Sequence, residues 1–156
     1  YSMKREKDAM PAQIEFTLTR PEEEHAALLA SIEEFGEDQA LPAALRYRLG
    51  LVVAELVSNC IDHGTPPGQD TTIKICVKNR DYEVVIEIDD TGPAFDPTTH
   101  PISPCSESGP VHIGGMGLCL VRNLVSSIVY SRLKSSNHIR VAIAKKSQEQ
   151  ECNSAK

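Results

Sequence analysis

The sequence has few basic residues for its size. Sixteen Lys and Arg stand against 22 Asp and Glu among 156 residues, which gives a formal net charge of −6. Proteins that bind nucleic acids in general gain affinity by neutralising phosphates with Lys and Arg, so this deficit argues against direct nucleic-acid binding. We expect a protein partner or a small ligand instead.

Long apolar runs are missing as well. No segment approaches the roughly 18 apolar residues of a membrane span, and the N-terminal residues lack the apolar core of a signal peptide. The five cysteines are odd in number and form no C-x-x-C pair, and three of them fall in apolar periodic segments. We therefore expect no membrane association, a cytoplasmic location and reduced thiols.

Two common kinds of catalytic site also lack their residues. The five histidines are scattered, and none is grouped with cysteines at the spacing of a zinc site. No serine has a visible base partner, so a serine hydrolase has no support. The composition, 40% hydrophobic and 24% charged, is that of an ordinary globular protein. We predict one domain at residues 13–146, with flexible ends at 1–12 and 147–156.

Apolar periodicity predicts a chain of mixed helices and strands. Alternation of apolar and polar residues indicates five strands, at residues 13–19, 72–78, 83–89, 129–133 and 139–144. Helical spacing indicates three helices, at residues 21–35, 42–64 and 114–128. Gly36 is the expected stop of the first helix. Strands adjacent in sequence form hairpins, so we predict an α/β two-layer sandwich, with helices on one face of a mixed, mainly antiparallel sheet.

The helix at 42–64 carries a polar row at steps of four. Glu55, Asn59 and His63 stack on one face, about a quarter turn from the apolar stripe. That stripe consists of Leu45, Leu49, Val52, Val53, Leu56 and Cys60. A carboxylate and a carboxamide one turn apart can hold a divalent cation and position an attacking group. A solvated helix edge fits the same row, and His63 is also compatible with a capping or packed histidine.

Three glycines, Gly114, Gly115 and Gly117, lie at the start of the third helix. Exposed N–H groups converge there, and the missing side chains let a phosphate approach the backbone. No Lys-Ser/Thr follows Gly117, so the segment is not a P-loop, and G-G-x-G lacks the spacing of a dinucleotide-binding fold. A flexible start of a helix without a ligand fits these residues too.

Asp90-Thr91-Gly92 closes the second strand of the central hairpin. A carboxylate at a sheet edge can accept a hydrogen bond from an exocyclic amine such as that of adenine. An ordinary strand-ending Asp-x-Gly turn is the other interpretation. The aperiodic segment 96–113 separates this turn from the three glycines. We expect this segment to be a lid, whose closure would bring the two glycine-bearing turns together around a pocket.

Taken together and in order, three stretches resemble the GHKL ATPase superfamily, and within it most closely the anti-sigma factor serine kinases. They are E-L-V-S-N-C-I-D-H-G from Glu55, I-E-I-D-D-T-G-P-A-F-D-P from Ile86 and G-G-M-G-L-C-L-V from Gly114. The resemblance implies a Bergerat ATP-binding fold, with ATP and Mg²⁺ held between the helices and the lid.

The resemblance also implies roles for individual residues. Glu55 would be the general base for a serine hydroxyl, and Asn59 would be the Mg²⁺ ligand. Asp90 would bind the adenine amine, and Gly92 would leave room for the base. The other cofactor-binding positions would be His63, Ala94, Gly114, Gly115, Met116, Gly117 and Leu118.

The implied activity is that of an ATP- and Mg²⁺-dependent protein-serine kinase in a bacterial partner-switching circuit. Such a protein phosphorylates an anti-anti-sigma factor of the STAS type and sequesters a sigma factor, and the helix at 21–35 could supply a homodimer interface. Two features depart from the family. Ala94 replaces the second glycine of D-x-G-x-G, and the segment 96–113 contains no Lys or Arg to meet the terminal phosphate. The alternative is a non-catalytic ATP-binding module that sequesters a partner.

Overall fold

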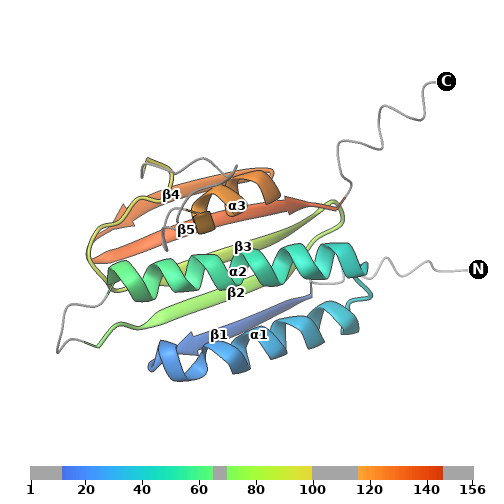
Figure 1. The fold of residues 1–156 in the computed structure, drawn as a ribbon, viewed down its shortest axis with the longest axis horizontal. Helices are drawn as coiled ribbons and strands as arrows, with labels where there is room; N and C mark the ends of the chain where they lie inside the picture. The colour runs from blue at the N-terminus through green and yellow to red at the C-terminus, as the bar shows by residue number, and fades with distance from the viewer. Residues whose placement is uncertain (1–11, 65–69, 100–115, 146–156) are drawn as a thin grey trace, which may run out of the picture.

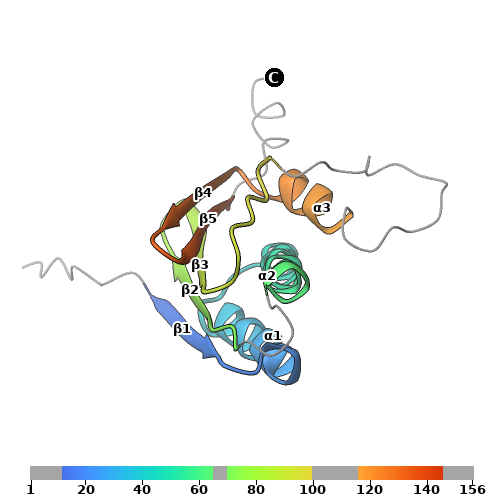
Figure 2. The same ribbon diagram turned by 90° about the vertical axis from the view of Figure 1, so that its left-hand side faces the viewer.

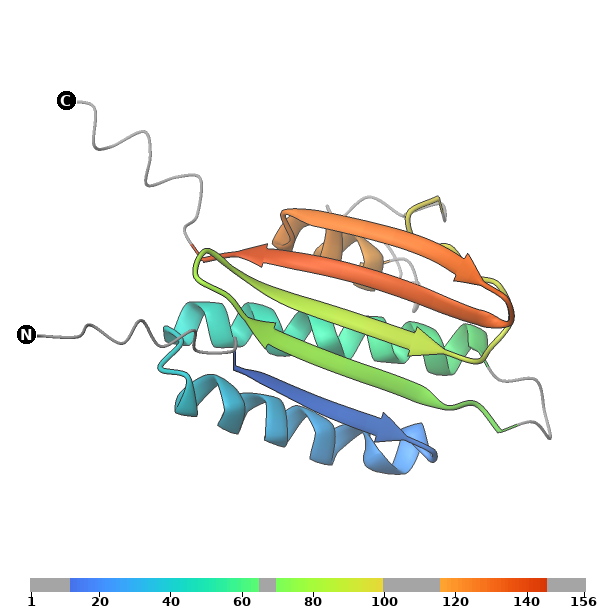
Figure 3. The same ribbon diagram turned by 180° about the vertical axis from the view of Figure 1, so that it is seen from behind.

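The fold has two layers, a sheet and a set of helices that covers one of its faces. The computed structural model describes residues 12–64, 70–99 and 116–145. Within these residues, three helices lie against a five-stranded sheet (Figure 1). The end-on view in Figure 2 shows all three helices on the same side of the sheet, and Figure 3 shows the opposite face without a helix. The predicted α/β two-layer sandwich is confirmed.

The strands of the sheet follow a simple order. They are β1 (Gln13–Leu18), β2 (Ile73–Asn79), β3 (Glu83–Asp90), β4 (Ser127–Leu133) and β5 (Ser136–Ala144). Their order is β1-β2-β3-β5-β4, and every pair of neighbours among these described strands is antiparallel. We expected a mixed sheet, and this detail is wrong. The chain crosses from β3 to β4, but β5 then returns from β4 by a tight hairpin and lies between them, so the two parallel strands are never neighbours.

The first two helices pack closely against each other at a glycine of the first helix. The helices are α1 (Pro21–Asp38), α2 (Ala43–Gly64) and α3 (Met116–Leu124). We expected Gly36 to end α1, but the helix continues through it. A Cβ on Gly36 would lie 2.9 Å from Cγ and Cδ of Arg46, so this glycine makes room for a side chain of α2. Arg46 in turn pairs with Glu33 of α1 at 2.9 Å. None of the described helices is both long and apolar enough to cross a membrane.

The third helix ends earlier than its apolar periodicity predicts. α3 stops at Leu124, because the Ser126 N–H donates to the Ala142 carbonyl at 2.8 Å and Ile128 pairs with Val141. Pairing with β5 therefore makes Ile128 part of a strand instead of a helix, and its β-branched side chain suits a strand. The predicted start of this helix at Gly114 and Gly115 lies outside the described residues. So do the lid beyond residue 99 and most of the two predicted flexible ends.

The apolar stripe of α2 faces the sheet, as predicted. All six of its residues are buried, and none is more than 6% exposed. They pack with inward-facing residues of the central strands such as Ile75, Ile86 and Val141. Because the stripe fixes the rotation of α2, the polar row a quarter turn away lies along the border of the core. Along this row Glu55 is partly buried, Asn59 is buried and His63 is exposed.

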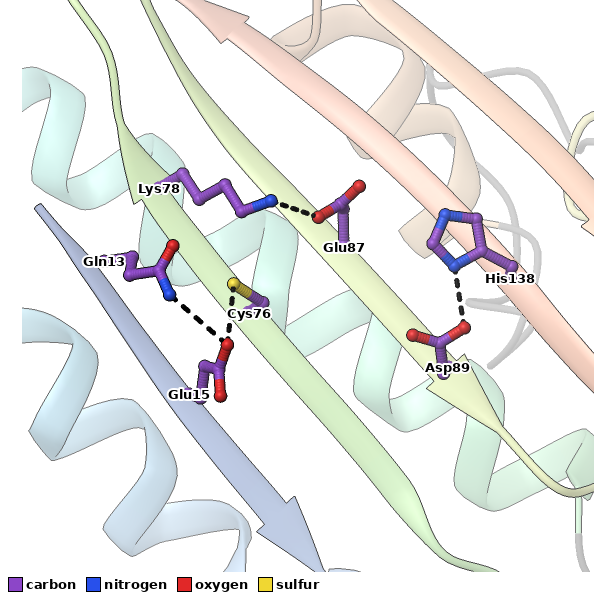
Figure 4. A network of polar contacts seen from close by, with 7 residues as sticks. All are labelled: Gln13, Glu15, Cys76, Lys78, Glu87, Asp89 and His138. Carbon is purple, nitrogen blue, oxygen red and sulfur yellow. Dashed lines mark hydrogen bonds and ion pairs between the residues drawn. The ribbon is translucent and has the colours of Figure 1, made fainter. Parts of the chain in front are cut away.

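The outer face of the sheet carries polar side chains from four strands (Figure 4). Lys78 of β2 pairs with Glu87 of β3 at 2.9 Å, and His138 of β5 pairs with Asp89 of β3 at 2.7 Å. The hydrogen bond from Lys78 lowers the pKa of Glu87, and the same bond raises the pKa of Lys78. Partly exposed pairs of this kind contribute about 0–1 kcal/mol each. This polar face is consistent with a sheet that packs helices on its inner side alone.

Three cysteines lie in the described part of the chain. Cys60 and Cys76 are free thiols, whereas Cys119 of α3 is disulfide-bonded. The expectation of reduced thiols throughout is therefore wrong for Cys119. An odd number of cysteines without a C-x-x-C pair does not predict which thiols the fold brings within bonding distance.

Candidate functional site

The Glu55 side chain reaches from α2 to the first turn of α3. A Cβ added to Gly117 would overlap the Glu55 carboxylate oxygen Oε2 and would lie 3.0 Å from its Cδ. Only glycine permits this close approach. The backbone N–H groups of Met116, Gly117 and Leu118 belong to the first turn of α3, where an α-helix has no internal partners for them. The fold thus places a carboxylate against the start of a helix, where free backbone N–H groups favour negative charge.

Asn59 lies one turn beyond Glu55 on the same helix and is 7% exposed. Its Nδ2 is buried and has no hydrogen-bond partner. An unpaired buried polar group costs about 1–3 kcal/mol, which a ligand with suitable polar atoms would offset. Turning the amide over exchanges its nitrogen and oxygen with little steric change. Asn59 can therefore present an amide oxygen, one of the ligands that Mg²⁺ accepts.

Asp90 ends β3 and is 5% exposed. Its Oδ1 accepts hydrogen bonds from the Gly92 N–H at 2.9 Å and from Asn137 Nδ2 at 3.0 Å, whereas its Oδ2 accepts from the Cys60 thiol at 3.5 Å. Burial, followed by the charge of Asp90, raises the pKa of Cys60 well above its ordinary value, so this thiol stays a donor. The bond to Gly92 is the Asp-x-Gly turn itself. Oδ2, with one weak thiol contact, has room for another donor such as an amine.

Asn59, Asp90 and His63 line the same cavity, together with Cys60 and Phe95. The His63 ring stacks on Phe95, with centroids 4.2 Å apart and planes at 6°. The cavity volume is about 10 Å³, which is room for about one water molecule. Three of the predicted ligand-binding residues therefore line one cavity, and this cavity has to widen before a purine base could reach Asp90.

The remaining predicted residues take different positions. Gly92 is buried next to Asp90, whereas Ala94 is exposed and does not line the cavity. Leu118 is 1% exposed, so its side chain is buried beneath α3. Met116 begins α3, and Gly114 and Gly115 lie outside the described residues. The extra methyl group of Ala94 thus leaves the cavity wall unchanged.

Two arginines that sequence reasoning missed hold the segment after β3. Arg132 of β4 donates to the Gly92 carbonyl at 2.8 Å. Arg122 of α3 donates to the carbonyls of Pro97 and Thr98 at 2.8 and 2.9 Å. Arg132 thus binds the turn that precedes the predicted lid, and Arg122 binds the first residues of that lid. No local motif indicates them, because each lies at least 24 residues from its partner along the chain.

Asn137 is the other site residue that was missed. It is a polar residue of β5 with 2% exposure, and its side chain lies against Asp90. The available signal is an amide side chain next to an otherwise apolar alternation. Such a side chain, when it is buried, nearly always has hydrogen-bond partners. The predicted strand at 139–144 begins after this residue, whereas β5 begins at Ser136.

Comparison with known proteins decides the family. The family model described as the histidine kinase-like ATPase domain matches residues 18–143 of the chain. The chain belongs to the histidine kinase-like ATPase family. The expected resemblance to GHKL ATPases is thereby confirmed, and the three motifs that carried it all lie within the matched range.

Individual relatives of this histidine kinase-like ATPase agree with that placement. It is similar to the serine/threonine-protein kinase BtrW of Bordetella bronchiseptica, with 33% identity over 98 residues that cover 62% of this chain and 69% of the relative. Two solved structures share the fold. One contains the RsbU and RsbW domains of a Mycobacterium tuberculosis protein, with a TM-score of 0.58, 13% identity and 85% of this chain covered. The other is a blue-light activated histidine kinase of Erythrobacter litoralis, with a TM-score of 0.53, 17% identity and 70% covered. The chain spans only 31% and 33% of those two structures.

Proposed function

We propose that the chain is an ATP- and Mg²⁺-dependent protein-serine kinase, built as one ATP-binding domain at residues 13–146. The observation that carries the proposal is the contact between the Glu55 carboxylate and the glycine-bearing start of α3. A general base has to lie close to the phosphate that is transferred, and the start of a helix is where phosphate binds. The relative named as a serine/threonine-protein kinase supports the same activity.

Each polar group of the site has a place in this chemistry. The first-turn N–H groups of α3, at Met116, Gly117 and Leu118, would donate to phosphate oxygens. Asp90 Oδ2 would accept a hydrogen bond from the adenine amine. Bound Mg²⁺ supplies positive charge beside the phosphates, and the Asn59 amide oxygen would be its ligand from this chain. Gly114 and Gly115, from the same glycine motif, would extend the phosphate-binding backbone.

Glu55 would act on the attacking group. Its carboxylate would accept the proton of a serine Oγ–H as the bond from Oγ to the γ-phosphorus forms. The bond from that phosphorus to the β–γ bridging oxygen breaks, and ADP leaves with its electron pair. Phosphoserine on the partner and ADP are the products.

The partners we propose are those of a partner-switching circuit in the cytoplasm. A STAS-type anti-anti-sigma factor would supply the serine, and a sigma factor would be sequestered. The resemblance of the three motifs to anti-sigma factor kinases supports this assignment. Homodimerisation through α1 remains a prediction.

A second candidate is an ATP-binding module that sequesters a partner without catalysis. The segment 96–113 has no Lys or Arg for the terminal phosphate. Arg122 contacts the first residues of this segment and Arg132 contacts the turn before it, and both donate to backbone carbonyls. This candidate predicts ATP binding without phosphoserine formation.

Thermal unfolding with nucleotide tests the binding part of the proposal. ATP with Mg²⁺ at a hundred times its Kd should stabilise the protein by about 2.7 kcal/mol, an increase in Tm of roughly 5–10 °C. EDTA should reduce this increase for the parent, and Asn59→Ala should reduce it to the EDTA level even with Mg²⁺ present. GTP with Mg²⁺ serves as the control nucleotide. An unchanged Tm with ATP would reject both candidate functions.

Gly117→Ala tests the contact between the two helices. The new Cβ overlaps the end of the Glu55 side chain, which is flexible and can move aside, so we expect a change in the free energy of unfolding below about 1 kcal/mol. Phosphoserine formation should fall at least about tenfold, because the base is displaced and the phosphate approach is narrowed. Gly50→Ala is the matched control, because Gly50 lies on α2 with no atom within 4 Å of an added Cβ, and it should keep full activity. Equal activity of the two variants would contradict the assigned position of Glu55.

A further inference from the structure

Asn137 uses all four hydrogen-bonding positions of its amide. Nδ2 donates to Asp90 Oδ1 at 3.0 Å and to the Pro93 carbonyl at 2.7 Å. Oδ1 accepts from the Tyr130 hydroxyl at 2.6 Å and from the Phe95 N–H at 3.3 Å. A carboxamide has two N–H donors and two acceptor lone pairs, so none is left over. Turning the amide over would place its oxygen against two other oxygens, so its orientation is fixed.

The Asn137 amide fixes the orientation of the Asp90 carboxylate. Asn137 and Asp90 lie directly opposite each other on β5 and β3. With the Gly92 N–H, Asn137 gives Oδ1 two N–H donors, whereas Oδ2 has the longer thiol contact from Cys60. A thiol is a weak donor. Oδ2 is therefore the oxygen that remains able to bind a ligand amine, and Asn137 prevents the two oxygens from exchanging places.

We propose that Asn137 is a positioning residue that sets the base selectivity of the site, because it presents Asp90 Oδ2 to the nucleotide and keeps Oδ1 bonded to the protein. This inference rests on the proposed ATP-binding function. An ionised carboxylate only accepts hydrogen bonds. Held in this orientation, it attracts the exocyclic amine of adenine and repels the carbonyl that guanine carries at the same place.

Asn137 is not needed simply to keep the following turn in place. The same segment is attached independently by Arg132 at Gly92 and by Arg122 at Pro97 and Thr98. The Phe95 N–H contact is the longest of the four that Asn137 makes. A movement of Phe95 would therefore leave the hydrogen bond from Asn137 to Asp90 intact. Loss of Asn137 should therefore affect which base is bound more than it affects folding.

The pair Asn137→Thr and Asn137→Val isolates the hydrogen bond to Asp90. Both side chains are β-branched, nearly equal in shape and suited to a strand, but only threonine keeps a donor. We expect Asn137→Val to weaken ATP binding about 10–100-fold while GTP binding stays within about threefold, so that the ratio of the two affinities falls. Asn137→Thr should keep this ratio within about threefold of the parent value. Isothermal titration of each variant with ATP and GTP in Mg²⁺ measures the ratio.

The outcomes separate the two levels of the proposal. Asn79→Ala is the control, because Asn79 also donates from its amide, to Gln39 at 3.0 Å, but it lies at the other end of its strand from the site. It should leave the ratio unchanged. A structural role alone would weaken ATP and GTP equally, and this result, or equal ratios for threonine and valine, would overturn the inference. A parent protein that binds no ATP would instead reject the proposed function. If valine prevents folding, a threonine variant with parental GTP affinity and lost ATP selectivity would also overturn it, whereas a retained ratio would support it.

Discussion

Glu55→Gln should lower phosphoserine formation by about 10²–10⁴-fold, the usual contribution of a general base, while ATP affinity stays within about threefold. Glutamine has the shape of glutamate, so the contact with Gly117 and the packing of α3 are kept. The neutral amide cannot take a proton from a serine hydroxyl. Transfer of radiolabel from ATP to the proposed anti-anti-sigma partner, measured alongside ATP binding by the same preparation, checks both parts.

The control for this change is Glu34→Gln. Glu34 is an exposed residue of α1, so the same chemical replacement there should leave transfer and binding unaltered. Full activity of Glu55→Gln would exclude Glu55 as the base. A parent protein that binds ATP but transfers no phosphate would favour the non-catalytic module instead.

Asp90→Asn should weaken ATP binding by at least about 100-fold, because a charge-assisted hydrogen bond is lost and an N–H₂ group takes its place. Gly92 and Asn137 donate to Oδ1, so the asparagine has to turn its oxygen towards them. The amino group of the asparagine then faces the position of the adenine amine. Both groups are hydrogen-bond donors, so they repel each other. The same arrangement suits a carbonyl acceptor, so GTP binding should weaken less or improve.

Asp89→Asn is a matched control for Asp90→Asn. Asp89 is the preceding residue, and because side chains alternate along a strand, it points to the outer face and pairs with His138 (Figure 4). Titration calorimetry should find parental ATP affinity for this variant. ATP binding by Asp90→Asn at parental strength would remove Asp90 from the site.

The features predicted well from the sequence are those with a local signature. The stripe and the polar row of α2 follow from helical periodicity, and the apolar alternation of the strands gives the sheet. Since the stripe has to be buried, it also fixes the side on which Glu55 and Asn59 emerge. Because α2 packs against β3 and α3, Asn59 lines a cavity with Asp90, whereas Glu55 lies against the start of α3.

The features that sequence reasoning missed depend on partners far away in the chain. Gly36 indicates a helix stop from sequence alone, but in the fold it makes room for the Arg46 side chain of the neighbouring helix. Ile128 continues the apolar period of a helix, but pairing with Val141 of β5 makes it part of a strand. The role of Asn137 needs Asp90, 47 residues away, to be recognised. Local patterns cannot contain such information.

The stacked rings of His63 and Phe95 line the cavity of the proposed base site, so they would compete with a base that binds there. Aromatic pairs are worth about 0.5–1.5 kcal/mol, so separating them before a base enters lowers the apparent affinity by roughly 2–13-fold. The intrinsic affinity of the polar groups for a nucleotide would therefore be higher than the affinity that a titration of the whole protein reports. A partner that draws Phe95 away would strengthen nucleotide binding without touching the nucleotide, and by reciprocity the nucleotide would strengthen the binding of that partner.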